Sequence, residues 1–238
     1  MRNVQVVFDD DNLMVYIDDK YIGNIMYSSN LYHNGNYYLK PQLQYYDTEV
    51  AEEVFSLLSQ KLDKPMQVML SSNDEESISF IQTAGFICRR KCYEIEACFQ
   101  DYIGKTTKET LSFAMIGHDI YEKCCEIMFD RYSSTHKAIN PWTGTKEDFF
   151  KMLPKVVFYE MDNNRIKNLA FVEDNEIAYV CGVDRADFAL FAQNLITEMF
   201  KQNELIVFEA DDCDEYAMEL KKLFTNQSEE SFDTYILK

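Results

Sequence analysis

The chain begins with short hydrophobic runs that alternate with polar clusters. The runs are rich in Val, Ile, Tyr and Met, and the clusters DDDN, DDK and HNG between them have the composition of turns. This pattern predicts an antiparallel meander of strands. We place these strands at Asn3–Phe8, Leu13–Ile17, Tyr21–Tyr27 and Asn36–Gln44.

After the meander, the hydrophobic period changes from that of a strand to that of a helix. Val50, Val54 and Leu58 recur at helical spacing, with glutamates near the start of the segment and a lysine near its end. This arrangement of charges suits the helix dipole. A proline follows, and the run Met66–Leu70 has the composition of a buried strand.

The stretch Ser71–Glu96 reads as a turn, a capped helix, a glycine stop and a long strand. Ser72 and Glu75 have the spacing of a capping box. In this motif the serine hydroxyl accepts from the amide of the glutamate, and the glutamate side chain accepts from the amide of the serine. Gly85 can adopt the left-handed conformation found just past a helix end. The residues after it, Phe86–Glu96, favour a strand.

A polar segment, Ala97–Thr107, separates this first series of elements from a second one. The second series ends as the first does, in the order strand, helix, strand, helix, strand, so that VMLSSNDEESISFIQTAGF is matched by IVFEADDCDEYAMELKKLF. Two further helices, which the first series lacks, precede this ending. We predict helices at about His118–Tyr132, Lys146–Leu153, Asp187–Met199 and Asp214–Phe224, strands at Val156–Met161, Ile166–Glu173, Glu176–Val183, Glu204–Glu209 and Ser231–Leu237, and a loop at Ser133–Asn140.

The run Asn73–Phe86, NDEESISFIQTAGF, resembles the last helix and strand of the GNAT superfamily of N-acetyltransferases. That family commonly shows an asparagine, a short helix with Phe-Tyr, and then Leu-Gly-Phe. Ile81 stands where a tyrosine general acid is often found. The resemblance, with the repeated layout, implies an α/β protein made of two tandem GNAT-like folds with mixed central sheets flanked by helices. Their predicted limits are 1–98, truncated, and 108–238, with a linker at 99–107.

The resemblance also implies acetyl-CoA as co-substrate and an amine of a small molecule or peptide as acceptor. Family members place a Gln/Arg-x-x-Gly-x-Gly/Ala run at the position of the turn between the predicted strand Glu176–Val183 and the helix that begins near Asp187, where helix amides hold the pyrophosphate. The chain has VDRADFALFAQ there, so the glycines are missing and only Arg185 and Ala189 match. The strand end Cys181-Gly182-Val183 resembles the splayed segment that binds the pantetheine arm; Gly182 could equally be a bulge glycine.

Acetyl transfer to an amine needs a base for the ammonium and an acid for the leaving thiolate. Glu176 resembles the general-base glutamate of some GNAT enzymes, although a solvent-facing turn glutamate is the alternative. Tyr216 is the only tyrosine of the last predicted helix and is the candidate acid. It stands out of the usual register, which falls at Leu220, and a core residue is the alternative.

The three histidines lack a neighbouring nucleophile motif, so no catalytic triad and no metal site are predicted. His136 and Trp142 lie in a predicted loop region that GNAT proteins often use to close over the acceptor. The tryptophan could equally be a packing residue.

Net charge limits the partners of the chain. The formal balance is 23 − 41 = −18, which repels nucleic acid and anionic membrane surfaces, so neither is an expected partner. Seven cysteines, an odd number without metal-ligand spacing, indicate reduced thiols. No apolar run reaches transmembrane length and the start lacks a basic-then-apolar signal segment, so the expected location is cytoplasmic. The acidity fits a solvated surface or a preference for cationic ligands such as amines, and the sequence does not set the oligomeric state.

Three hypotheses for the function follow. The first is an acetyl-CoA-dependent N-acetyltransferase with its active site in the C-terminal copy. The second is a degenerate, non-catalytic GNAT-fold module that binds a small molecule or protein, which the missing glycines, Ile81 and Leu220 favour. The third is a related scaffold that uses another acyl or aminoacyl donor.

Overall fold

The computed structural model describes residues 2–9, 11–107, 110–225 and 227–238. The chain forms two compact units: the first contains residues 1–91, 137–144 and 230–238, and the second contains residues 92–136 and 145–229. This division differs from the predicted limits at 98 and 108, because the last strand and one distant loop belong to the first unit. The predicted linker is not separate either, since Tyr102 forms a β-bridge with Phe224 of the second unit.

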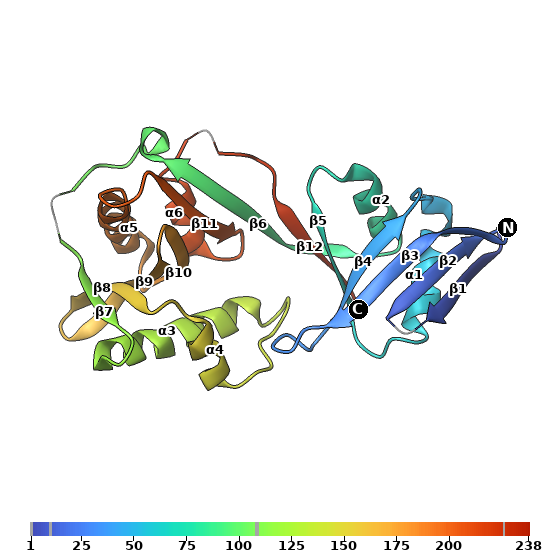
Figure 1. Ribbon diagram of the computed structural model, residues 1–238, viewed down its shortest axis with the longest axis horizontal. Coiled ribbons are helices and arrows are strands. Elements are labelled where there is room, and N and C mark those ends of the chain that lie inside the picture. Colours follow the sequence, from blue (N-terminus) through green and yellow to red (C-terminus); the bar gives the residue numbers. More distant parts are fainter. Residues whose placement is uncertain (1, 10, 108–109, 226) are drawn as a thin grey trace. The chain divides into compact units, whose positions relative to one another are not determined.

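The first unit opens with the predicted antiparallel meander (Figure 1). Asp18 and Asp19 both have positive φ, 50° and 62°, which gives the two-residue turn that joins neighbouring strands with their natural twist. A fifth strand then pairs parallel to the fourth. The five strands are β1 (Val4–Asp9), β2 (Asn12–Ile17), β3 (Lys20–Ser29), β4 (Tyr37–Leu43) and β5 (Met66–Ser71).

Two helices of the first unit, α1 (Ala51–Ser59) and α2 (Glu75–Thr83), follow β4 and β5 as predicted. The predicted capping box at the start of α2 is wrong. Asp74 caps the helix by accepting from the amide of Ser77 at 3.1 Å. The Ser72 hydroxyl instead accepts from the amide of Ser231, 159 residues away, at 3.0 Å; Ser231 directly precedes the last strand of the chain.

The sheet of the first unit is completed by the last strand of the chain, β12 (Phe232–Leu237). This strand pairs antiparallel with β5 along six residues, and in the sheet it lies between β5 and β6 (Ile87–Cys98). Tyr235 and Ile236 of β12 are buried. The hydrophobic core of the first unit therefore depends on residues from both ends of the chain.

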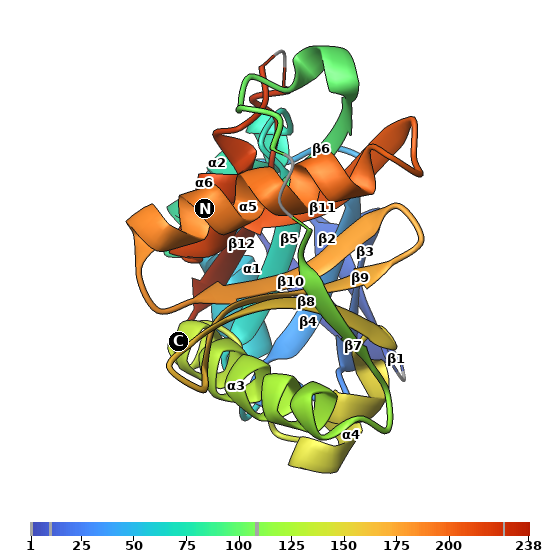
Figure 2. The same ribbon diagram turned by 90° about the vertical axis from the view of Figure 1, so that its left-hand side faces the viewer.

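The second unit repeats the order of the first and adds two helices before it. Figure 2 shows α5 and α6 on one face of the strands β8–β10, with α3 and α4 on the other. Its sheet is completed by the second part of β6, which pairs antiparallel with β11 from Cys98 to Cys92. The elements are β7 (Ser112–Met115), α3 (Asp119–His136), α4 (Lys146–Met152), β8 (Val156–Asp162), β9 (Arg165–Glu173), β10 (Glu176–Gly182), α5 (Arg185–Met199), β11 (Leu205–Asp211) and α6 (Glu215–Lys221).

The α/β class and the repeated order of elements are thus as predicted, with two differences in the second unit. Strand β7 has only four residues, three of them exposed, and it is not among the predicted strands. Helix α3 continues to His136, so the predicted loop at Ser133–Asn140 is helical in its first half. None of the helices in the described part of the chain is both long enough and apolar enough to cross a membrane.

The loop 137–144, between α3 and α4, packs within the first unit. The Trp142 ring stacks on Tyr32, with ring centroids 4.8 Å apart. The Nδ1 atom of His33 lies 2.8 Å from the carbonyl oxygen of Asn140 and 3.3 Å from that of Pro141. Because a carbonyl oxygen can only accept, Nδ1 carries the proton of the neutral ring. Trp142 is therefore a packing residue here.

Acidification should weaken this loop contact. Burial lowers the pKa of His33 from 6.5, so the unfolded chain binds a proton more readily than the folded one. The stability that the neutral ring contributes is full above about pH 6.5 and is lost as the pH falls through the lower folded pKa. We expect urea unfolding from pH 7.5 to 5.5 to show a smaller loss of stability in His33→Gln than in the parent chain. Equal losses would contradict this account.

The C-terminal strand should control the stability of the N-terminal sheet. Ile236→Ala removes a side chain that is 3% exposed and should cost about 2–5 kcal/mol. Amide hydrogen exchange in β5 should then accelerate. The control is Phe232→Ala on the same strand, where the side chain is 41% exposed and the expected cost is about 1 kcal/mol or less. Unchanged exchange in β5 with Ile236→Ala would be inconsistent with the pairing.

Candidate functional site

The parallel strands β10 and β11 of the second unit lie side by side only at their beginning. The one residue pair between them is Glu176 with Val207, and the Val207 amide donates to the carbonyl oxygen of Asn175 at 3.0 Å. Beyond this point β10 pairs with β9 on its other side, while β11 pairs with β6. The two strands are therefore unpaired from there to Gly182, the strand end that the sequence singled out, and we call this unpaired stretch the gap.

A bulge interrupts β10 near the closed end of this gap. The register with β9 shifts between Ile177 and Tyr179, so Ala178 has no direct partner on that strand. A bulge re-aims the backbone groups beside it and is common next to functional sites. Ala178 thus lies where the strand could offer backbone hydrogen bonds to a ligand in the gap.

Gly182 ends β10 in a crowded place. A Cβ atom there would lie 2.8 Å from Asn168 Oδ1, 3.0 Å from Tyr216 Cε1 and 3.1 Å from Phe188 Cδ2. Tyr216 is only 5% exposed. The absence of a side chain at Gly182 thus lets two protein rings approach the open end of the gap.

Arg131 of α3 binds the residues on the far side of this gap. Its guanidinium lies 4.8 Å from the centre of the Tyr216 ring and forms ion pairs with Asp214 at 2.9 Å and Glu215 at 3.4 Å. Burial and the nearby Glu215 raise the pKa of Tyr216, so its hydroxyl keeps its proton at neutral pH. Burial also raises the pKa of the Cys181 thiol to about 11, which excludes a reactive thiolate there at neutral pH.

The start of α5 follows β10 directly and is capped by the chain itself. Asp184 Oδ1 accepts from the amides of Ala186 at 2.9 Å and Asp187 at 3.2 Å. These are amides that a helix start would otherwise offer to a phosphate. The exposed Arg185 binds Glu219, with Nε to Oε1 at 3.0 Å, and Ala189 lies one turn further along the helix.

Glu176, the sequence candidate for a general base, lies at the closed end of the gap and is exposed. Six residues, about 20 Å of extended strand, separate it from Gly182 and the Tyr216 ring beside Gly182. The structure brings Cys181, Gly182 and Tyr216 together. It does not bring Glu176 into that group.

A histidine beside β11 was not singled out as a base from the sequence. His136, 7% exposed, ends α3, and its Nδ1 lies 3.0 Å from the carbonyl oxygen of Tyr132. Its Nε2 lies 3.8 Å from Asp211 Oδ2 at the end of β11. The Tyr132 ring stacks on His136 and also contacts Tyr179 of β10, so the imidazole lies beside both strands. The four-residue spacing from Tyr132 to His136 is the helical signal that could have placed it.

Comparisons with known proteins were made by sequence and by structure. No family model matches the chain, and no curated protein was found that matches its sequence. Among solved structures, a GCN5-related N-acetyltransferase from Sphaerobacter thermophilus matches with a TM-score of 0.52 at 10% identity, over 95% of this chain and 80% of its own. The chain has the GNAT fold.

Two other solved structures were compared with the chain. A conserved protein of unknown function from Enterococcus faecalis V583 has a TM-score of 0.50 at 11% identity, over 94% of this chain and 61% of its own. A GNAT-family acetyltransferase from Colwellia psychrerythraea has a TM-score of 0.49 at 10% identity, over 95% of this chain and 85% of its own. The fold assignment rests on the matches at 0.50 and above, which extend over both units of this chain.

The Arg131 ion pairs should hold the open end of the gap together. Arg131→Gln leaves two carboxylates without their guanidinium and should cost about 1–3 kcal/mol, measured by urea unfolding. The control is Arg185→Gln, because that arginine is exposed and its ion pair with Glu219 is screened by water. The midpoint urea concentration of Arg185→Gln should be nearly that of the parent chain. Equal effects of the two substitutions would refute a special role for Arg131.

Proposed function

We propose that the second unit binds an acyl-CoA thioester, acetyl-CoA in the first instance, in the gap between β10 and β11. It transfers the acyl group to an amine of a small molecule or peptide. The observation that supports this proposal is the single residue pair between the two strands, Glu176 with Val207. It leaves one edge of the β10 backbone available for the amide groups of a pantetheine arm.

His136 is the base that this arrangement favours. Its Nδ1 proton is directed to the Tyr132 carbonyl, so the lone pair of the neutral ring is on Nε2, and Asp211 stabilises the imidazolium after protonation. The base takes a proton from the acceptor ammonium. The free amine then attacks the thioester carbonyl carbon, a C–N bond forms and the C–S bond breaks. The amide nitrogen loses its second proton, and this loss balances the proton that the thiolate takes.

The leaving thiolate needs a proton donor near the open end of the gap. The Tyr216 hydroxyl carries a proton at neutral pH, and the Tyr216 ring lies beside Gly182, which supports the role predicted for this residue. A raised pKa makes it a weaker acid than an ordinary tyrosine. Tyr216 also has to yield space to the pantetheine arm, because its ring packs against Gly182.

A non-catalytic GNAT-fold module is the second candidate, and the start of α5 favours it. The amides of Ala186 and Asp187 are already bound by Asp184, so a pyrophosphate would have to displace a carboxylate of its own charge sign. In the acyl-transfer account, most of the affinity for the thioester therefore comes from the pantetheine arm and the β10 backbone.

Acetyl-CoA binding and turnover separate these two functions. A ligand that binds only the folded chain raises the free energy of unfolding by about 2.7 kcal/mol when its free concentration is about 100 times its Kd. Acetyl-CoA should therefore raise the melting temperature. Released CoA thiol, assayed against a panel of amines, measures transfer. His136→Gln should lower kcat about 10²–10⁴-fold with acetyl-CoA binding retained.

The matched control is His118→Gln, since His118 is exposed and lies at the other end of α3. It should leave kcat unchanged. Binding without turnover across the panel would support the non-catalytic module. If millimolar acetyl-CoA gives no rise in melting temperature and no calorimetric heat of binding, the acyl-transfer proposal is rejected.

A further inference from the structure

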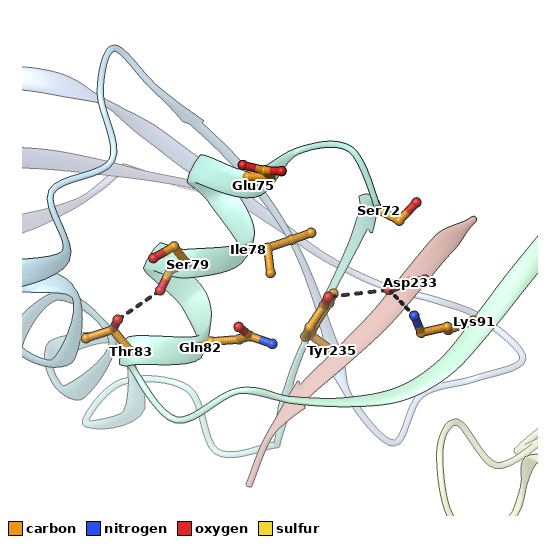
Figure 3. Close-up of a pocket in the computed structure, with 9 residues that line it drawn as sticks. All are labelled: Ser72, Glu75, Ile78, Ser79, Gln82, Thr83, Lys91, Asp233 and Tyr235. Carbon is orange, nitrogen blue, oxygen red and sulfur yellow. Dashed lines mark hydrogen bonds and ion pairs between the residues drawn. The ribbon is translucent and has the colours of Figure 1, made fainter. Parts of the chain in front are cut away.

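The first unit contains a pocket of its own, apart from the gap between β10 and β11. It has a volume of about 610 Å³ and lies between α2 and the strands β6 and β12 (Figure 3). Glu75, Ser79 and Gln82 line it from one face of α2. Lys91 of β6 and Asp233 of β12 line the opposite wall.

Asp233 is the unusual group of this pocket, because its carboxylate is buried, with 3% of the residue exposed. One oxygen, Oδ1, accepts from the Ser231 hydroxyl at 2.7 Å. The other, Oδ2, has the Tyr235 hydroxyl at 3.4 Å and the Lys91 ammonium at 3.8 Å. Charge-assisted hydrogen bonds are usually shorter than 3 Å. Oδ2 therefore has only long contacts with these two groups, although a buried charge is costly unless closely paired.

The charges around the pocket select the kind of ligand. Glu75 and Asp233 are two carboxylates against the single ammonium of Lys91, so an anion would be repelled. A neutral alcohol could hydrogen bond with Ser79 or Gln82 but would not compensate the Asp233 charge. The Lys91 side chain is 46% exposed and flexible, so it can move aside for a better-placed cation.

We propose that this pocket binds a small protonated amine, whose ammonium group lies against Asp233 Oδ2 in place of Lys91. Hydroxyl and amide groups of Ser79 and Gln82 on α2 accept its further hydrogen bonds, and Glu75 adds a second negative charge. The site needs no acyl-CoA, so it is independent of the acyl-transfer proposal. The net charge of −18 raises the concentration of cations near the chain and favours their capture.

The test uses 1,4-diaminobutane as the probe and 1,4-butanediol as its neutral match, each added to the full chain. Amide shifts in ¹H–¹⁵N NMR spectra report the site. The diamine should shift the amides of Lys91, Asp233 and Tyr235 in a saturable way, and the diol should not. Equal shifts with the diol, or no saturable shift with the diamine at tens of millimolar, would overturn the proposal.

Two substitutions locate the amine. Asp233→Asn keeps the shape of the side chain and should weaken diamine binding by about ten-fold or more, since the ammonium loses the negative charge at the Lys91 position beside Oδ2. Lys91→Met removes the competing ammonium and should tighten binding. Undiminished binding to Asp233→Asn would refute the site. If Asp233→Asn does not fold, Glu75→Gln on the exposed face of α2 takes its place, and it must weaken binding of the diamine for the proposal to stand.

Discussion

The pairing of β12 with β5 is the interaction on which the rest of the structure depends. It joins the last strand of the chain to a strand from its first third. In the same way, β11 pairs antiparallel with the distant strand β6. Without these partners, β5 and β11 would each have an open edge, which invites aggregation. Because the partner strands come from distant parts of the sequence, neither unit is a continuous segment of chain.

The corresponding pairing of β6 with β11 sets the limits of the candidate site. Since β11 pairs with β6 along its whole length, its contact with β10 can be as short as one residue pair without loss of the strand. The gap that results is the feature on which the acyl-transfer proposal rests. At its open end, Arg131 contacts the Tyr216 ring and pairs with Asp214, and Asp184 binds the first amides of α5.

The local sequence pattern was enough to predict most of the helices and strands, because turn clusters and helical periodicity depend on only a few neighbouring residues. It failed where a partner is far away in the sequence. Ser72 has the spacing of a cap but bonds to Ser231, and Arg185 matches a phosphate motif but binds Glu219. Cys181–Val183 was singled out only by family resemblance. Local pattern did not single out His136, the base of our proposal, because Asp211 beside it comes from a strand 75 residues later.

The exchange of strands is tested most directly by a cross-link between β5 and β12. Ser71 and Phe232 are opposite residues of this antiparallel pair, where Cβ atoms lie about 4.5–5.5 Å apart. With Ser71→Cys and Phe232→Cys in one chain, mild oxidation and peptide mapping by mass spectrometry should find a disulfide between the two introduced cysteines. Neither single substitution should give that peptide. The account is contradicted if the doubly substituted, folded chain forms no such disulfide, or if the cysteine at position 232 joins a native cysteine of the second unit instead.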